Sequence, residues 1–195
     1  HNVMGIEFEN TRHAVMADNL VYNNSTGLML TLIPGLPIKD GNNLIIRNNI
    51  IRDNNLANFA PASSIAATVP EGLGLGIEGV DDVIVKNNHF EGNNGVGVFV
   101  VDMYSFGLGG DTKVEPYSDN IQIRENTWIN NGNDPIGVLA DLIAMTGQSG
   151  LEMLTTGKER TSCSVEQENF DHLGTKKWSA CADKGSHPDY QTAML

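Results

Sequence analysis

The stretch Leu44-Ile-Ile-Arg-Asn-Asn-Ile-Ile-Arg-Asp-Asn54 decides the fold class of this chain, because its pattern returns three more times without a gap. The other copies are Ala14-Val-Met-Ala-Asp-Asn-Leu-Val-Tyr-Asn-Asn24, Val83-Ile-Val-Lys-Asn-Asn-His-Phe-Glu-Gly-Asn93 and Ile121-Gln-Ile-Arg-Glu-Asn-Thr-Trp-Ile-Asn-Asn131. Each copy follows the template apolar-x-apolar-x-x-Asn-x-apolar-x-x-Asn. Alternating apolar residues predict short strands with one buried face, and their regular return predicts a solenoid.

Asparagine holds the same two places in every copy of the template. The first column is Asn19, Asn49, Asn88 and Asn126, and the second is Asn24, Asn54, Asn93 and Asn131. The first asparagine falls between two strands, where the chain must turn sharply and asparagine tolerates left-handed backbone. Its amide both donates and accepts, so stacked asparagines can bond to one another along the solenoid. The shared register favours such a buried ladder over a role as surface turn residues.

A third strand completes each turn of the solenoid and is marked by glycine. These strands are Gly5-Ile-Glu-Phe8, Gly27-Leu-Met-Leu30, Gly76-Ile-Glu-Gly79, Gly97-Val-Phe-Val100 and Gly137-Val-Leu-Ala140. Uneven spacing between them predicts insertions at Ile33–Asn42, Leu56–Gly72 and Asp102–Asp119. The sequence therefore predicts an all-β protein, a parallel β-helix of about five turns over residues 1–141. The signatures of leucine-rich repeats and β-propellers are absent.

At this point the chain resembles bacterial right-handed parallel β-helix repeat proteins of the pectin-lyase-like superfamily. The matching text is Leu32-Ile-Pro-Gly-Leu-Pro37, Asn48-Asn-Ile-Ile-Arg-Asp-Asn-Asn55, Asn58-Phe-Ala-Pro61 and Val69-Pro-Glu-Gly72. The resemblance covers roughly residues 1–140 and transfers no catalytic residues. The superfamily holds polysaccharide lyases, glycosidases and uronate epimerases, but also adhesins and passive scaffolds. The fold alone does not choose among them.

Composition narrows the classes of partner. The 195 residues carry a net charge of −12, which argues against nucleic acid and against anionic membranes, since both need a basic face. No apolar run approaches the roughly 20 residues that a membrane span needs. The chain begins at His1, almost inside a strand, which fits either a processed product or a domain trimmed from a longer chain.

The tail departs from the template after about residue 141. Apolar spacing over Asp141–Thr156 is compatible with a helix, and we expect residues 142–195 to form an irregular, partly helical cap rather than an independent domain. Cys163 and Cys181 lie in this tail, and a cysteine pair in an exported acidic protein predicts a disulfide. Two unrelated buried thiols are the alternative. Phe170 and Trp178 would complete the core of the cap.

The resemblance implies that substrate would lie along the glycine-marked sheet, between long loops. The residues expected to point outward from that sheet are Glu7, Met29, Glu78, Phe99 and Leu139. None is cationic, whereas lyases and epimerases of polyuronates must neutralise a carboxylate. The Asp-Pro-His-Asp signature associated with alginate epimerases is also missing, because Ile136 follows Asp134-Pro135.

Other candidate groups have plain structural readings beside the functional ones. Asp81-Asp82 is the adjacent acidic pair inside the solenoid and would suit an inverting glycosidase, but turns before strands commonly carry aspartate. The insertion 102–119 holds Asp102, Tyr104, Asp111, Lys113, Glu115 and Tyr117, which could bind a sugar or belong to any surface loop. The histidines show no metal-ligand spacing, so we expect neither a dedicated metal nor a cofactor.

Two functional hypotheses follow. The first is an exported, periplasmic or extracellular protein that binds or modifies a polysaccharide; an enzyme of this kind would be a lyase, an epimerase or a glycosidase. Glu78, Phe99, Asp102, Tyr104 and Tyr117 are its predicted substrate-binding residues. The second is a scaffold without an active site. An open N-terminal end exposes strand edges, which predicts either a covering segment or self-association there.

Overall fold

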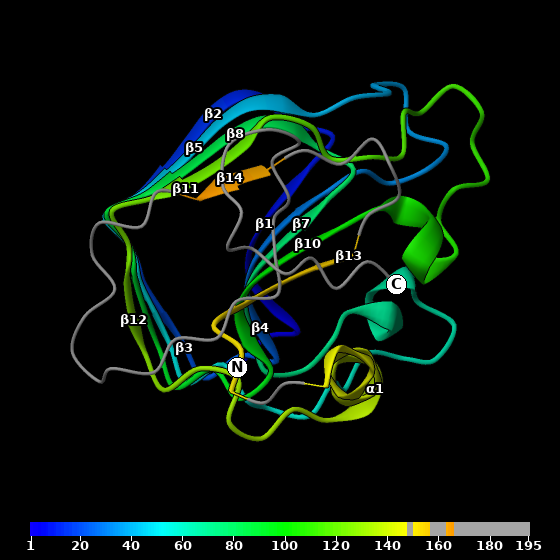
Figure 1. Cartoon of the computed structure of the whole chain (residues 1–195). Coiled ribbons are helices and arrows are strands. Elements are labelled where there is room, and N and C mark those ends of the chain that lie inside the picture. The colour runs from blue at the N-terminus through cyan, green and yellow to red at the C-terminus, as the bar shows by residue number, and fades with distance from the viewer. Residues whose placement is uncertain (148–149, 157–162, 166–195) are drawn as a thin grey trace.

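The computed structural model describes residues 1–147, 150–156 and 163–165, and their strands form three parallel sheets (Figure 1). The first sheet contains β1 (Met4–Glu9), β4 (Thr26–Thr31), β7 (Leu73–Glu78), β10 (Val96–Val101) and β13 (Met153–Thr156). The second contains β2 (Arg12–Ala17), β5 (Asn42–Arg47), β8 (Asp81–Lys86), β11 (Ile121–Arg124) and β14 (Cys163–Val165). The third contains β3 (Leu20–Tyr22), β6 (Ile50–Arg52), β9 (His89–Glu91) and β12 (Thr127–Ile129).

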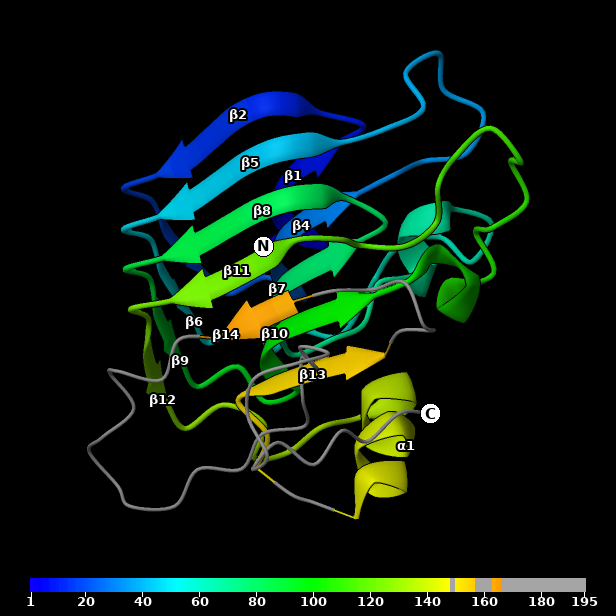
Figure 2. The same cartoon turned by 45° about the horizontal axis from the view of Figure 1, so that its top comes forward.

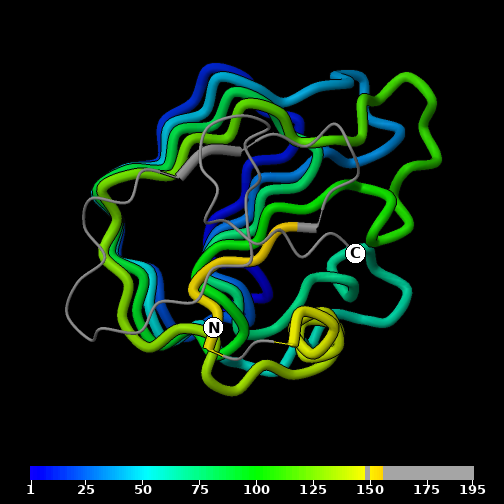
Figure 3. Tube along the Cα trace, viewed as in Figure 1, coloured from blue at the N-terminus to red at the C-terminus, as the bar shows by residue number. Residues whose placement is uncertain are grey.

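Consecutive strands visit the three sheets in turn, so that each circuit of the chain stacks on the one before it. We call one such circuit a coil. Every strand pairing is parallel, and Figure 2 shows the strands of successive coils lying one below another. In the tube view the coils follow nearly the same three-sided outline, from which the insertions and the yellow helical segment before β13 depart (Figure 3). The predicted parallel β-helix is confirmed.

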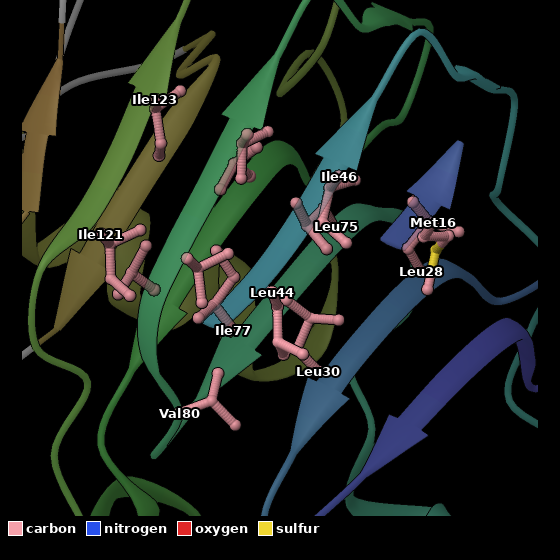
Figure 4. Packing of buried hydrophobic residues seen from close by; sticks show 14 of the residues in the cluster. Met16, Leu28, Leu30, Leu44, Ile46, Leu75, Ile77, Val80, Ile121 and Ile123 are labelled. Atoms are coloured by element: carbon pink, nitrogen blue, oxygen red, sulfur yellow. The ribbon is translucent and has the colours of Figure 1, made fainter. Parts of the chain in front are cut away.

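The core is aliphatic and lies inside the three sheets. Side chains from all three sheets meet there, and Figure 4 shows Leu28, Leu30, Leu75 and Ile77 of the first sheet opposite Leu44 and Ile46 of the second. Each of these six side chains is almost fully buried. The alternating apolar positions of the template are therefore the inward positions, as period-two burial requires.

The corner between the second and third sheets differs from the prediction in one detail. The left-handed residue is the one before the first-column asparagine, namely Asp18, Asn48, Asn87 and Glu125, with φ between 54° and 61°. The asparagines that follow are not among the residues with positive φ. The doubled asparagines thus have two tasks, because the first of the pair turns the backbone and the second points its amide inward.

The inward amides form continuous hydrogen-bonded ladders. The backbone N–H and Nδ2 of Asn49 donate to Oδ1 of Asn88 at 3.0 and 2.9 Å, and Nδ2 also donates to the carbonyl of Met16 at 2.9 Å. Asn19 donates to Asn49 and Asn88 to Asn126 in the same way. The second column, Asn24, Asn54, Asn93 and Asn131, repeats this arrangement at the next corner.

Glycine marks the first sheet because successive coils approach too closely there for a side chain. A Cβ atom on Gly5, Gly27, Gly74 or Gly97 would lie 2.4–2.7 Å from a carbonyl oxygen of the next coil. The register therefore runs through Gly74, and the predicted alignment on Gly76 was wrong by two residues. Gly76 instead pairs with Met29 and Phe99, and the Met29 side chain lies over it.

The fifth coil also differs from the prediction. The expected strand Gly137–Ala140 is the start of helix α1 (Gly137–Thr146), and β13 takes the fifth place in the first sheet. Leu139, expected to point outward from that sheet, is buried on α1. Both β13 and β14 lie beyond residue 141, the predicted end of the solenoid. Cys163 begins β14, but its side chain and all of Cys181 lie outside the described residues, so the predicted disulfide is not described.

Candidate functional site

The connections that follow the first sheet project from one side of the solenoid, as Figure 1 shows. Residues 32–41 and 102–120 lie together, because Nζ of Lys39 is 2.6 Å from Oδ2 of Asp111 and the Gly35 N–H donates to the same oxygen at 3.1 Å. This ion pair, with two backbone N–H donors, lowers the pKa of Asp111 to about 2. The two insertions therefore form one continuous wall.

The outer face of the first sheet does not form an open groove at the predicted place. Met29, Glu78 and Phe99 were expected to point outward from this sheet toward a substrate, but their exposed fractions are only 5, 3 and 1%. Glu78 also stands in the next column, paired with Thr31 and Val101. A second apolar cluster covers this face and contains Leu73, Val96, Phe99, Val101, Leu139, Ile143, Leu151 and Leu154. Helix α1 is thus packed where a ligand was expected.

An open groove lies beside this cluster, where three connections meet. Its volume is about 580 Å³. Helix η1 (Ile65–Thr68) and the residues after it form one wall, helix η2 (Met103–Phe106) forms another, and the start of α1 forms the third. The lining residues are Asn58, Ala67, Thr68, Val69, Pro70, Glu71, Ser105, Phe106, Ile136, Gly137 and Val138.

The η1 wall is fixed by the side chains of Asn58 and Glu71. Nδ2 of Asn58 donates to the carbonyls of Ala66 and Val69 at 2.9 Å each. Oε1 of Glu71 accepts from the Asn58 backbone N–H at 2.7 Å. The Pro70 carbonyl accepts from the buried Thr26 hydroxyl at 2.6 Å, which ties the wall to β4.

The η2 wall is held by its cap and by aromatic packing. Asp102 accepts from the Ser105 backbone N–H at 3.0 Å and from its hydroxyl at 3.2 Å, which is an N-cap arrangement. Phe106 meets Phe99 edge to face, with ring centroids 6.1 Å apart. Phe99 is therefore a support beneath the groove, and Phe106 presents an aromatic surface to it.

The third wall is the first turn of α1. Ile136 is its N-cap residue and provides no side-chain hydrogen bond. The first N–H groups of a helix have no intrahelical acceptor. Because Gly137 and Val138 line the groove, this turn places backbone donors beside the exposed aliphatic side chains of Ile136 and Val138.

Three carboxylates gather near the second sheet, outside the groove. Carboxylate oxygens of Asp81, Glu115 and Asp119 lie within 4.8 Å of one another, a donor set of the kind that hard cations such as Ca²⁺ prefer. Burial raises the pKa of Asp81 to about 6, with further increases from the charges of Asp119, Glu115 and Asp82. Asp81 also accepts from the Asp119 N–H at 2.8 Å, so it joins the 102–120 insertion to β8.

The five predicted binding residues do not form one exposed surface. Glu78, Phe99 and Asp102 are buried, whereas Tyr104 is 48% exposed. Tyr104 packs edge to face on Tyr117, with ring centroids 5.9 Å apart. The groove residues were missed as a group, because no periodic signal connects positions 58, 105 and 136; Asn58 and Glu71 appeared only within the motifs of the resemblance.

The comparison with protein families matches residues 1–106 to the right handed beta helix region. This match spans more than half of the chain and agrees with the three parallel sheets. The chain belongs to the right-handed β-helix family. No curated protein and no solved structure matches this right-handed β-helix protein. Within its described residues, no helix is long and apolar enough to cross a membrane.

Proposed function

We propose that this β-helix protein binds a neutral carbohydrate in the groove between η1, η2 and α1. The observation that carries the proposal is the composition of the groove, an open space of about 580 Å³ with apolar and polar groups close together. Phe106, Ile136 and Val138 offer apolar surfaces for sugar C–H groups. The Ser105 hydroxyl oxygen can accept from a sugar hydroxyl, and the first turn of α1 offers backbone N–H donors.

The charge of the groove favours neutral over acidic sugars. Among the described residues that line it, Glu71 is the ionisable one and none is Lys or Arg. A polyuronate would therefore bring its carboxylates to a site without a cation. The chain as a whole repels polyanions too, with its net charge of −12.

The same composition favours binding over catalysis. Glycoside hydrolysis ordinarily uses two carboxyl groups on either side of the scissile bond. The groove offers one, and Oε1 of Glu71 is already engaged by the Asn58 N–H. We include in the proposal a periplasmic or extracellular location, where polysaccharides are the common polymers.

The test is direct binding to a panel of neutral, cationic and acidic oligosaccharides, measured by calorimetry on the wild type and two variants. Val138→Arg places a long cation in the groove, and we expect it to weaken neutral-sugar binding at least about tenfold. The matched control is Val15→Arg, because Val15 is similarly exposed but lies on β2. Unchanged binding in Val138→Arg would place the sugar elsewhere, and tight polyuronate binding without Ca²⁺ would contradict the charge argument.

A scaffold role is the second candidate, favoured by the strand edges of β1, β2 and β3, which have no partner among the described residues. Within the described residues each of these strands pairs on one side only, and a hollow of about 440 Å³ lies between β1 and β3. Such edges pair readily with other strands. Light scattering over a range of protein concentrations tests self-association. No binding to any sugar class, together with concentration-dependent assembly, would favour the scaffold.

A further inference from the structure

Two carboxylates are buried beside the groove without a cation between them. Glu78 and Asp102 are each 3% exposed, and no described Lys, Arg or His forms an ion pair with either. Oε2 of Glu78 accepts from the Thr31 hydroxyl at 2.8 Å. Oε1 of Glu78 is buried and has no hydrogen-bond partner in the described part of the chain. A buried oxygen left in this condition is costly when the group is charged.

The strand register places the two groups near each other. Glu78 at the end of β7 pairs with Val101 at the end of β10, and Asp102 follows Val101 directly. Asp102 is also the N-cap of η2, and both of its oxygens accept from Ser105. A change in the charge of Glu78 therefore alters the electrostatic surroundings of Asp102, the residue that caps η2.

The groups facing Glu78 do not offset its charge. From β4 the neutral Thr31 hydroxyl donates to it, and from the β10–η2 junction the charge of Asp102 acts on it. Glu9 stands in the same column on β1, beyond Thr31, and is exposed. The nearby insertions contribute Lys39 and Asp111, which pair with each other. Ionisation of Glu78 would thus add a buried negative charge that no described cation offsets, close to the carboxylate that caps η2.

We propose that Glu78 and Asp102 form a proton-operated latch that sets the position of η2 and thereby regulates the groove. With Glu78 neutral, Asp102 keeps its cap and η2 stays against the solenoid. With Glu78 ionised, repulsion between the carboxylates weakens the cap and displaces the wall that carries Ser105 and Phe106. The effect on a ligand rests on the proposed carbohydrate-binding function, whereas the movement of η2 does not.

The direction and range of the latch follow from its surroundings. Burial, and to a smaller extent the charge of Asp102, raise the pKa of Glu78 to about 7, while the Thr31 hydroxyl acts in the opposite direction. The latch is thus closed in mildly acidic solution and opens as the pH rises through neutrality. Removing the Thr31 hydroxyl should move the opening to higher pH.

Hydrogen exchange of the full chain tests the latch without any sugar. Wild type and Glu78→Gln are compared at the same pH, so that the intrinsic pH dependence of exchange cancels. At pH 8.5 we expect amides of residues 102–110 to exchange about tenfold faster in the wild type, the factor that one pKa unit represents. At pH 5.5 the two proteins should agree. Glu125→Gln is the control, because Glu125 is an exposed corner residue, and it should match the wild type throughout.

Thr31→Val keeps the test decisive if Glu78→Gln does not fold. In this variant the increase in exchange should begin at a higher pH than in the wild type. Exchange of residues 102–110 that is independent of Glu78 and Thr31 at both pH values would overturn the latch. If the exchange results hold and no sugar binds, the latch stands and the carbohydrate proposal fails. If a neutral sugar binds equally at pH 5.5 and 8.5 while exchange does change, η2 moves without regulating the groove, and the regulatory claim is overturned.

Discussion

At the scale of single residues, the asparagine columns hold one coil to the next. Asn49 and Asn88 are each 1% exposed, and each amide bonds to a coil on either side. A buried amide with this many bonds cannot be replaced by an apolar residue without stranding its partners. The residue before each of them has a different task, since Asn48 and Asn87 turn the backbone with φ of 56° and 54°.

Because the two residues have different tasks, substitutions at Asn88 and at Asn87 should affect stability differently. We expect Asn88→Ala to lower the free energy of unfolding by roughly 1–3 kcal/mol, because the Asn49 donors lose their acceptor inside the protein. Asn87→Gly is the matched control and should change stability little, since glycine adopts left-handed backbone freely. Urea denaturation of both variants measures the difference. Equal losses in the two variants would mean that the corner conformation, and not the ladder, matters for stability.

At the scale of elements, α1 determines which part of the outer face of the first sheet is covered and where a groove remains open. Its buried residues Leu139 and Ile143 complete the second apolar cluster with Leu73, Val96 and Phe99. The same helix places Ile136 and Val138 in the groove. The groove therefore depends on packing that is separate from the core of the solenoid.

Truncation inside this cluster should show that separation. We expect Leu139→Ala to lower the free energy of unfolding of this cluster by about 2–5 kcal/mol, because the side chain is fully buried. In this variant the backbone amides of β2 and β5 should keep their protection from hydrogen exchange, while the backbone amides of α1 and η2 should lose their protection. Loss of protection across all strands at once would show instead that α1 and the solenoid unfold as one unit.

At the scale of the whole molecule, buried acids make stability depend on pH. Burial is the main cause that raises the pKa of Glu7 and of Glu78 to about 7 and that of Asp81 to about 6. The folded protein thus holds protons that the unfolded chain has released above about pH 4.5. Stability from these groups is present below that pH and is lost as the pH rises to about 7.

Denaturation at pH 5 and pH 8 checks this sign. We expect the wild type to be less stable at pH 8 than at pH 5, with Glu78 accounting for a loss on the order of 3 kcal/mol or less in the free energy of unfolding. Glu7 and Asp81 are about half-buried, so solvent screening makes their contributions smaller. Glu78→Gln should remove most of the dependence. Greater stability of the wild type at pH 8 than at pH 5 would contradict the assignment of Glu78 as a buried acid.

The sequence by itself determined the solenoid. A parallel β-helix repeats one local rule in every coil, so alternating apolar residues, corner asparagines and the gap lengths were sufficient to place the first four coils, the ladder of the first asparagine column and the three insertions. There were two exceptions, namely the glycine register at the third coil and the fifth coil, where the expected strand Gly137–Ala140 is the start of α1. Both Gly74 and Gly76 satisfy the local pattern, and only the distance to Gly97 of the next coil distinguishes them.

Only the tertiary structure decided the candidate site. The sequence offered Asp102 and Tyr104 as candidates within an insertion, and it did not decide whether Phe99 faces a ligand or packs under the insertions. It gave no sign that Asn58, Ser105 and Ile136 share a groove. The pairing of Lys39 with Asp111 spans 72 residues, and the helix at Gly137 replaces a strand because Leu139 finds an apolar surface on β7 and β10. Contacts of this kind depend on where irregular connections fold back, and a periodic pattern carries no information about that.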